Sequence, residues 1–220
     1  MNNPDKIRNL RRLLQKWGES NIINYPWRYN ENPYFVLVSE FMLHRTQVKQ
    51  VIPIYSEFVK AYPTLKKLAN APDNQIKKIL SPLGLQWRIT SMVKALKELW
   101  RRYKEIPTDF EQLIETPGIG NYIAGATICF SLNQKQTLVD TNTVRVSARI
   151  AGLSLEGEAR RKAEVISIIE KFCDPIEPRK YYYSMIDLAH SLCLPKTPVC
   201  SKCPLLSIPC KFGSQIPELG

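Results

Sequence analysis

Four cysteines near the C-terminus have a spacing at which thiolates can share one metal centre. Cys193, Cys200, Cys203 and Cys210 are separated by six, two and six residues. Thiolates bind zinc, and four of them also suit a [4Fe–4S] cluster. Zinc ligands typically come in closely spaced pairs, and only Cys200 and Cys203 form such a pair. Spacing alone leaves zinc and iron–sulfur as equal alternatives.

The two other cysteines, Cys129 and Cys173, lie in apolar or isolated contexts, which favours a structural role for each. The first residues lack the uninterrupted apolar core of a secretory signal. We therefore expect a cytoplasmic protein, associated with the nucleoid if its source is prokaryotic. Disulfides are disfavoured in that compartment.

One glutamate is placed where it could transfer a proton. Glu40 lies in "VLVSEFMLHRTQV". If this stretch is a helix, its neighbours three and four residues away are Val36, Leu37, Leu43 and His44, so the carboxyl group sits on a largely apolar face. Desolvation there disfavours the charged form, which suits a general acid. A carboxylate at the rim, or one satisfied by a local partner, is the alternative.

A second carboxylate, Asp140, follows "TLV" and precedes a helix that should end near Gly152. Aspartate is among the best helix N-caps, so we expect Asp140 to cap this helix. Asn142, two residues further on, could support the same site, although polarity at a helix start would also explain it.

The stretch "TPGIGNYIAGA" places two glycines directly before a helix start. Gly118 and Gly120 can both adopt positive φ. A helix that begins near Asn121 then directs backbone N–H groups outward beside Ile119 and the glycines, and this arrangement suits a phosphate of a nucleic acid. An ordinary tight connection between two helices is the alternative. A dinucleotide-binding loop is excluded by the absence of a preceding strand.

The overall charge favours a polyanionic partner. Lys and Arg number 31 against 20 acidic residues, which gives a formal net charge of +11. Nucleic acid and an acidic membrane surface both fit this excess, and a merely basic soluble protein is the third alternative. Because no apolar run reaches the roughly 20 residues of a membrane helix, we expect no membrane association.

The elements that must position these residues are helices, so the sequence predicts an all-α fold. Asn3 and Pro4 provide a cap and a first position for an N-terminal helix. A second helix is expected from about Tyr34 to Gln50, with a break near Pro53. A later stretch repeats apolar residues with helical spacing, and a short helix capped by Thr108 or Asp109 should precede the glycines. The apolar face of the later stretch consists of Ile89, Met92, Val93, Leu96 and Leu99.

Several ordered motifs together resemble one family. "LIETPGIGNYIAGA" resembles the helix-hairpin-helix of the DNA glycosylases that include endonuclease III and MutY, and "TLVDTNTVRVSARIAG" resembles the strand-like entry, aspartate and helix that follow it. The first part, "YPWR…NPYFVLVSEFMLHRTQV", resembles MutY and the archaeal thymine mismatch glycosylases. The resemblance implies a two-lobed helical fold with DNA bound across the cleft between the lobes. We expect lobes of residues 1–28 with 136–220 and of residues 29–135.

The resemblance also implies that the four cysteines hold a [4Fe–4S] cluster. The family usually has five residues between the last two cysteines, where this chain has six. Lys196, Lys202 and Lys211 lie in this loop, so a cluster could fix a basic loop against phosphates. A solvated surface is the equal alternative for these lysines.

The roles that the resemblance implies for the site residues are those of base excision. Glu40 would protonate or activate at the scissile base, and Asp140 would stabilise positive charge on the sugar. Tyr122 lies where bifunctional members have the lysine that forms a Schiff base, so a monofunctional glycosylase without lyase activity is expected. Tyr122 would contact the nucleotide flipped out of duplex DNA, or it is a core tyrosine.

The choice of base depends on smaller differences. "MLHRTQV", with His44, Arg45 and Gln47, is closer to the thymine branch than the glutamine-rich "MLQQTQV" of adenine glycosylases. Leu85 and Gln86 are candidates for a second DNA-facing turn, and a simple connection between helices is the alternative. Ten residues follow Cys210, and we therefore expect this protein to lack the domain with which full-length MutY enzymes recognise 8-oxoguanine.

We therefore expect removal of thymine or uracil opposite guanine, by a monomer acting on double-stranded DNA with a mismatched or damaged base. Removal of adenine opposite guanine or 8-oxoguanine is the alternative, because "TQVKQVIPIYSEF" resembles the adenine branch. A non-catalytic DNA-binding module is less favoured, because it would not require Glu40 together with Asp140.

Overall fold

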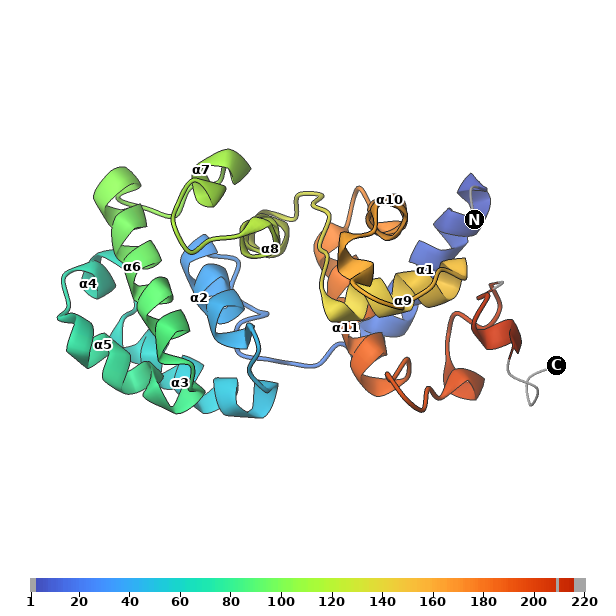
Figure 1. Cartoon of the computed structure of the whole chain (residues 1–220), viewed down its shortest axis with the longest axis horizontal. Helices are drawn as coiled ribbons and strands as arrows, with labels where there is room; N and C mark the ends of the chain where they lie inside the picture. Colours follow the sequence, from blue (N-terminus) through green and yellow to red (C-terminus); the bar gives the residue numbers. More distant parts are fainter. Residues whose placement is uncertain (1–2, 209, 216–220) are drawn as a thin grey trace. The chain divides into compact units, whose positions relative to one another are not determined.

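The computed structural model describes residues 3–208 and 210–215, and every regular element in this part of the chain is a helix, as the all-α expectation requires (Figure 1). The chain divides into two compact units. Met1–Ile23 and Asn133–Gly220 form the first, which we call the terminal unit; Asn24–Leu132 forms the second, the central unit. None of the described helices is both long and apolar enough to cross a bilayer.

The central unit is built around two helices that are apolar on nearly all sides. Helices α2 and α8 pack against each other, and each buries most of its residues. A helix that is hydrophobic all round is stable in water only when other elements enclose it. The α-helices of this unit are α2 (Pro33–Leu43), α3 (Val48–Ala61), α4 (Leu65–Ala69), α5 (Asp73–Leu80), α6 (Gln86–Tyr103), α7 (Phe110–Ile114) and α8 (Asn121–Leu132).

The terminal unit joins the two ends of the chain. Its first helix packs on its last one, and α9 contacts both α10 and α11. Leu10 and Leu14 of α1 are fully buried in this packing. The α-helices of this unit are α1 (Pro4–Asn21), α9 (Thr141–Ala151), α10 (Ala163–Phe172) and α11 (Pro178–Ser191). The segment from Cys193 to Cys210, which we call the cysteine loop, follows α11 and contains the short 3-10 turn Cys200–Lys202.

The expected single helix from Tyr34 to Gln50 is wrong. Helix α2 ends at Leu43, and Arg45 has a φ of 60°, which a continuous right-handed helix does not allow. Helix α3 then runs through Pro53, where we expected a break. The proline removes one hydrogen bond, but Ile54 and Phe58 bury their side chains on the same helix, and this packing outweighs the loss.

The other expected helix starts and ends are confirmed. Asn3 accepts a hydrogen bond from the Asp5 amide at 2.8 Å, and Asp109 accepts one from Gln112 at 3.0 Å. Gly152, with a φ of 73°, follows the end of α9. Cys129 and Cys173 are buried, in agreement with a structural role.

Candidate functional site

The connection between α7 and α8 is fixed by Gly118 and Ile119. Gly118 has a φ of 96° and packs so closely on Ser91 of α6 that a Cβ atom there would overlap the Ser91 hydroxyl. The Ile119 amide donates to the Thr116 carbonyl at 3.0 Å, and the Ile119 side chain is buried. The close packing of Gly118 and the hydrogen bond and burial of Ile119 lie on either side of the peptide bond between them, and together they hold the connection in one conformation.

Only one of the two hairpin glycines uses the positive φ that glycine permits. Gly120 is not among the residues with positive φ, and a Cβ atom on it would meet nothing within 4 Å. Gly120 and Asn121 are exposed, so the N-terminus of α8 opens to solvent. An exposed helix N-terminus offers backbone N–H groups to an anion, and this is the feature that a DNA phosphate requires.

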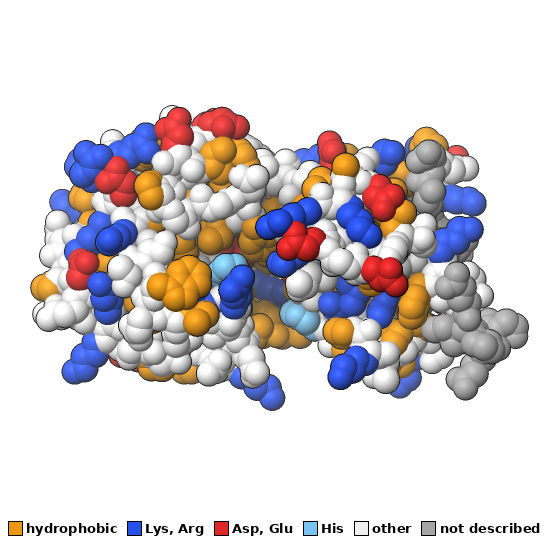
Figure 2. Space-filling view, in the orientation of Figure 1, with side chains coloured by type: hydrophobic (Ala, Val, Ile, Leu, Met, Phe, Trp, Pro, Cys, Tyr) orange, Lys and Arg blue, Asp and Glu red, His pale blue; other side chains and the backbone are white. Residues whose placement is uncertain are grey.

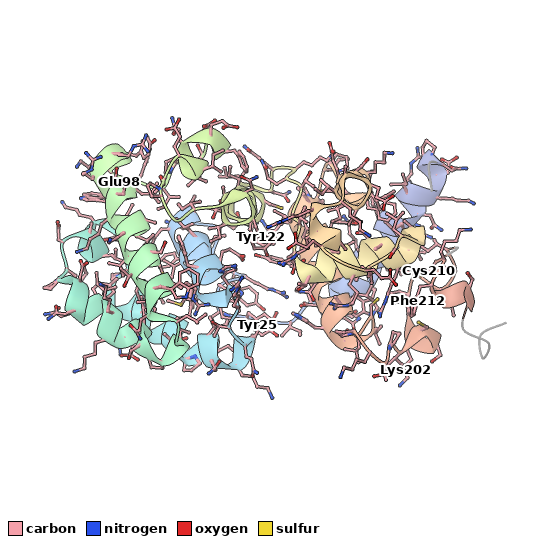
Figure 3. The ribbon with its side chains drawn as sticks, viewed as in Figure 1. Tyr25, Glu98, Tyr122, Lys202, Cys210 and Phe212 are labelled. Atoms are coloured by element: carbon pink, nitrogen blue, oxygen red, sulfur yellow. The ribbon has the colours of Figure 1, made fainter. Side chains whose placement is uncertain are left out.

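Glu40 and Tyr122 lie on the two central helices of the same unit. Glu40 is only 6% exposed on α2, where Val36 and Leu37 are also buried, so its carboxyl group is largely removed from solvent. Tyr122 lies at the start of α8, half-buried against the hydrophobic core (Figure 3). Because α2 packs on α8, a buried carboxyl group and a phenol are carried by neighbouring helices.

The residues after α2 form an exposed turn. His44, Arg45 and Gln47 are all exposed, and Arg45 adopts the left-handed conformation. This conformation costs a residue other than glycine about 1–2 kcal/mol. Such strain is found where a side chain must be presented in a set direction. The left-handed conformation at Arg45 therefore marks this exposed turn as a candidate contact surface.

A second exposed turn precedes α6, and Trp87 at the start of that helix is a candidate contact residue that was not predicted from the sequence. Gly84 and Leu85 both have positive φ, and the buried Arg88 donates from Nη2 to the Leu83 carbonyl at 3.3 Å. Leu85 in the turn is 43% exposed, and Trp87 at the start of α6 is 59% exposed. Gln86, between them, is also exposed.

The signal for Trp87 was present in the sequence. Trp87 lies off the apolar stripe of α6, which includes Ile89 and Met92, and a tryptophan on the polar side of an amphipathic helix needs an explanation. It shares a helix face with Ser91, four residues on, and Ser91 contacts Gly118 of the hairpin. An exposed aromatic side chain therefore lies on the same face of α6 as the serine that packs against the hairpin.

In the terminal unit, Asp140 caps α9 as expected. Its Oδ1 accepts hydrogen bonds from the amides of Asn142 at 3.1 Å and Thr143 at 2.7 Å. Its Oδ2 accepts from Nδ2 of Asn142 at 2.9 Å, so Asn142 supports the carboxylate directly. Both carboxylate oxygens are thus held by donors, which fixes the orientation of the group.

Arg145 continues this network and was also missed from sequence. Its Nη2 donates to Oδ1 of Asn142 at 3.1 Å and to the Ala189 carbonyl at 2.9 Å. Its Nε donates to the Cys193 carbonyl at 2.9 Å. A chain of hydrogen bonds therefore connects Asp140 with the first residue of the cysteine loop.

The four cysteines of the loop line one small cavity, which an arginine and apolar side chains complete. Burial raises the pKa of the Cys203 thiol to about 11, and the neighbouring thiols Cys193, Cys210 and Cys200 add to the shift. Burial also raises the pKa of Cys200. Within the described residues, no three His, Cys, Asp or Glu side chains converge closely enough to be ligands of one ion. The residues that complete the cavity are Val146, Arg149, Ile150, Leu188, Leu192, Leu205 and Phe212.

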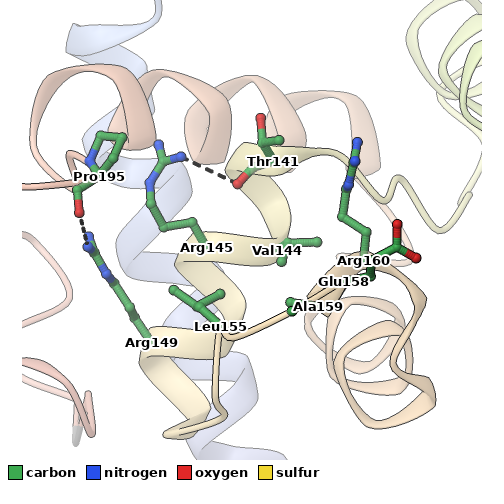
Figure 4. Close-up of a pocket in the computed structure, with 10 residues that line it drawn as sticks. Thr141, Val144, Arg145, Arg149, Leu155, Glu158, Ala159, Arg160 and Pro195 are labelled. Carbon is green, nitrogen blue, oxygen red and sulfur yellow. Dashed lines mark hydrogen bonds between the residues drawn. The ribbon is translucent and has the colours of Figure 1, made fainter.

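A larger cavity of about 340 Å³ lies beside the start of α9 (Figure 4). Arg145, Arg149 and Arg160 line it, together with Thr141 and Pro195. Lys196, Lys202 and Lys211 of the cysteine loop are exposed, and Lys and Arg side chains outnumber Asp and Glu on the visible faces of both units (Figure 2). The positive charge expected for a nucleic acid partner is therefore present at the surface.

Curated relatives of this chain include thymine-DNA glycosylases. The thymine-DNA glycosylase of Aeropyrum pernix is 32% identical over 92% of this chain and 94% of its own length. A thymine/uracil-DNA glycosylase of Pyrobaculum aerophilum is 34% identical over 90% of this chain and 87% of its own. An adenine DNA glycosylase of Buchnera aphidicola is 34% identical, but this chain spans only 52% of its length.

The fold and a family model agree with these relatives. A solved structure of a thermostable thymine-DNA glycosylase superposes with a TM-score of 0.88, at 24% identity, over 96% of this chain and 98% of that one. The model of the HhH-GPD superfamily of base excision DNA repair proteins matches residues 38–181, which include Glu40, the hairpin and Asp140. This chain is a member of the HhH-GPD superfamily of base excision DNA repair proteins.

Proposed function

We propose that this protein is a monofunctional DNA glycosylase that hydrolyses the N-glycosidic bond of thymine or uracil opposite guanine. The observation that carries the proposal is that the family region contains two carboxyl groups in defined settings: Glu40 is buried on α2, and Asp140 accepts hydrogen bonds on both oxygens at the start of α9. When two carboxyl groups have different environments, one can act as an acid while the other stays charged and stabilises positive charge. Relatives that act on thymine match this chain along nearly their whole length.

In this proposal Asp140 acts through its charge. Cleavage of a glycosidic bond develops positive charge on the sugar, and a carboxylate with a fixed orientation stabilises that charge without rearranging during the reaction. Asn142 and the first amides of α9 supply the fixed orientation. With these donors in place, Asp140 can keep the same hydrogen-bond partners while the glycosidic bond breaks.

Glu40 is proposed to act as the proton donor or activator at the departing base. Its burial on α2 keeps the carboxyl group away from bulk water, and a carboxyl group within reach of the departing base could act there as an acid or as an activator. Tyr122, His44 and Arg45 would then contact the flipped nucleotide and the guanine that it leaves. Arg45 is suited to guanine, because its guanidinium can pair with two acceptors on one edge of that base.

Tyr122 is the reason for proposing a monofunctional enzyme. A lyase needs an amine that attacks the sugar, and a phenol cannot form a Schiff base. We therefore propose that the product is an abasic strand with an intact backbone.

We further propose that the four cysteines hold a [4Fe–4S] cluster. They fit such a group in number and type, because four thiols line one cavity whose remaining lining is an arginine and apolar side chains. When bound, the cluster would crosslink the loop that carries Lys196, Lys202 and Lys211 and hold these lysines toward phosphates. Iron and sulfide analysis of the anaerobically purified protein tests the assignment against zinc.

The function is tested on labelled duplexes containing G:T, G:U, A:G or A:8-oxoguanine, each treated with hot alkali after incubation. Strand cleavage only after alkali, in the thymine or uracil strand, is expected. The variant Glu40→Gln should lose base release while it keeps duplex affinity, and Glu57→Gln, an exposed glutamate on α3, is the matched control. Cleavage without alkali, or borohydride trapping of the protein on DNA, would overturn the monofunctional assignment.

Adenine removal is the second candidate, because adenine DNA glycosylases also match the chain. The same experiment decides between the two. Cleavage in the adenine strand, with the G:T and G:U duplexes intact, would assign this protein to the adenine branch.

A further inference from the structure

Arg149 connects α9 with the first end of the cysteine loop. The residue is 7% exposed, so its guanidinium lies inside the terminal unit. Nη1 donates to the Leu194 carbonyl at 2.7 Å. Nη2 donates to the Pro195 carbonyl at 2.8 Å, a contact drawn in Figure 4. Nη1 also lies 3.3 Å from Sγ of Cys193 as a donor.

The same residue holds the other end of the loop. Its guanidinium carbon lies 4.4 Å from the centre of the Phe212 ring, within the range of a cation–π contact. Its carbonyl accepts from the Phe212 amide at 3.1 Å and from Sγ of Cys210 at 3.7 Å. The neighbouring Ile150 carbonyl accepts from the Lys211 amide at 3.2 Å.

These contacts matter because the loop has little regular structure of its own. Between Leu194 and Cys210 the described residues contain one 3-10 turn, Cys200–Lys202. A loop of this kind keeps a set shape only if contacts outside it offset the loss of conformational entropy. Arg149 supplies such contacts at both ends, and Nη1 is a donor to the sulfur of a candidate ligand.

We infer that Arg149 is the positioning residue of the cysteine loop. It fixes both ends of the loop to α9, so that the four thiols line one cavity before any metal centre enters. Its N–H donor to Cys193 then sets the electronic environment of the bound group, because hydrogen bonds to ligand sulfurs tune the reduction potential of iron–sulfur clusters. Only this second part rests on the proposed cofactor.

The first part is tested in full-length protein freed of metal by a chelator and a reductant. Hydrogen exchange is compared between the wild type, Arg149→Met, Arg149→Lys and the control Arg160→Met, which removes an exposed arginine of the same unit. In Arg149→Met, the Lys211 and Phe212 amides should exchange about tenfold faster or more, because the loop opens locally. In Arg160→Met they should exchange as in the wild type. Unchanged protection in Arg149→Met would overturn the inference.

Two further variants keep the test decisive if Arg149→Met does not fold. Phe212→Ala removes the ring contact but leaves the carbonyl contacts at Leu194 and Pro195, so it should loosen the second end of the loop alone. Arg149→Lys keeps the charge but cannot reach both carbonyls with a rigid fork, so its protection should be intermediate. Wild-type protection in both variants would contradict the positioning role.

The second part is tested on the cluster-loaded protein. Arg149→Met should shift the reduction potential of the cluster to more negative values, since it removes a donor to sulfur, and Arg160→Met should not. An unchanged potential in Arg149→Met would overturn this part. Absence of iron from the wild type would refute the proposed cofactor and with it this part, and the exchange experiment would still decide whether Arg149 positions the loop.

Discussion

Replacing Gly118 with alanine tests whether the hairpin depends on one close approach. At this position φ is 96°, a conformation that side chains disfavour. An added Cβ atom would overlap Oγ of Ser91, while the Ser91 carbonyl oxygen and Cβ would lie at 3.4 and 3.7 Å. The substitution therefore has a conformational cost and a separate steric cost.

The two costs can be estimated separately. A left-handed residue other than glycine loses about 1–2 kcal/mol. Overpacking at a tight contact costs about 1–3 kcal/mol. Gly118→Ala should then lower the free energy of unfolding by about 2–5 kcal/mol. The second substitution Ser91→Ala removes the overlapping oxygen, so the double variant should recover the steric part and keep the conformational part.

Denaturant unfolding of the wild type, Gly118→Ala, Ser91→Ala and the double variant measures the steric and the conformational cost. Gly120→Ala is the matched control. At Gly120 φ is not positive and the added Cβ would meet nothing within 4 Å, so the loss should stay within about 0.5 kcal/mol. Equal losses of unfolding free energy in Gly118→Ala and Gly120→Ala would refute this account of the hairpin. So would a loss at Gly118 that Ser91→Ala leaves unchanged.

Three further predictions concern the site and the core. Asp140→Asn should keep the helix cap but slow single-turnover base release by about 10²–10³, with thermal unfolding near that of the wild type. Trp87→Ala should weaken duplex binding by about tenfold in fluorescence anisotropy, because one stacked base contributes about 1–3 kcal/mol, and Trp87→Phe should retain most of the affinity. Burial raises the pKa of Tyr55 to about 12 and also raises that of Tyr34. The unfolded chain therefore releases these protons first, and stability in pH-dependent unfolding should fall as pH rises from about 10 to 12, less so in Tyr55→Phe.

Local signals in the sequence were sufficient to predict several of the helix starts and ends. Asn3, Asp109 and Asp140 cap their helices through short-range hydrogen bonds, which depend on residues two or three positions away. Gly152 ends α9 for the same kind of local reason. Such features are visible without any knowledge of the rest of the fold.

The break between α2 and α3 could not be predicted in this way. The apolar pattern continues from Val36 to Val51, and Pro53 is the strongest local breaker. The structure turns instead at Arg45 and tolerates the proline, because packing within the central unit decides the boundary. The sequence likewise left the φ of Gly120 open, because a glycine permits a positive φ but does not require it.

Arg145 and Arg149 were missed because a charged residue on a helix is ordinarily assigned to solvent. Helix α9 contacts both α10 and α11, so more of its circumference is enclosed than an amphipathic pattern suggests. Long side chains on it then reach carbonyl groups of the cysteine loop. Their acceptors lie more than 40 positions away in the chain, and only the tertiary fold brings them together.

The same reasoning explains why Glu40 and Tyr122 are the informative residues of the central unit. Helices α2 and α8 are enclosed by other elements, so packing favours an apolar residue at nearly every position. Burying a carboxyl group costs free energy that an apolar residue would not lose. Packing alone therefore does not explain the glutamate, and the proton transfer proposed for it would supply a reason. A polar residue at a position where packing favours an apolar one is, on this chain, the clearest sequence signal for the proposed chemistry.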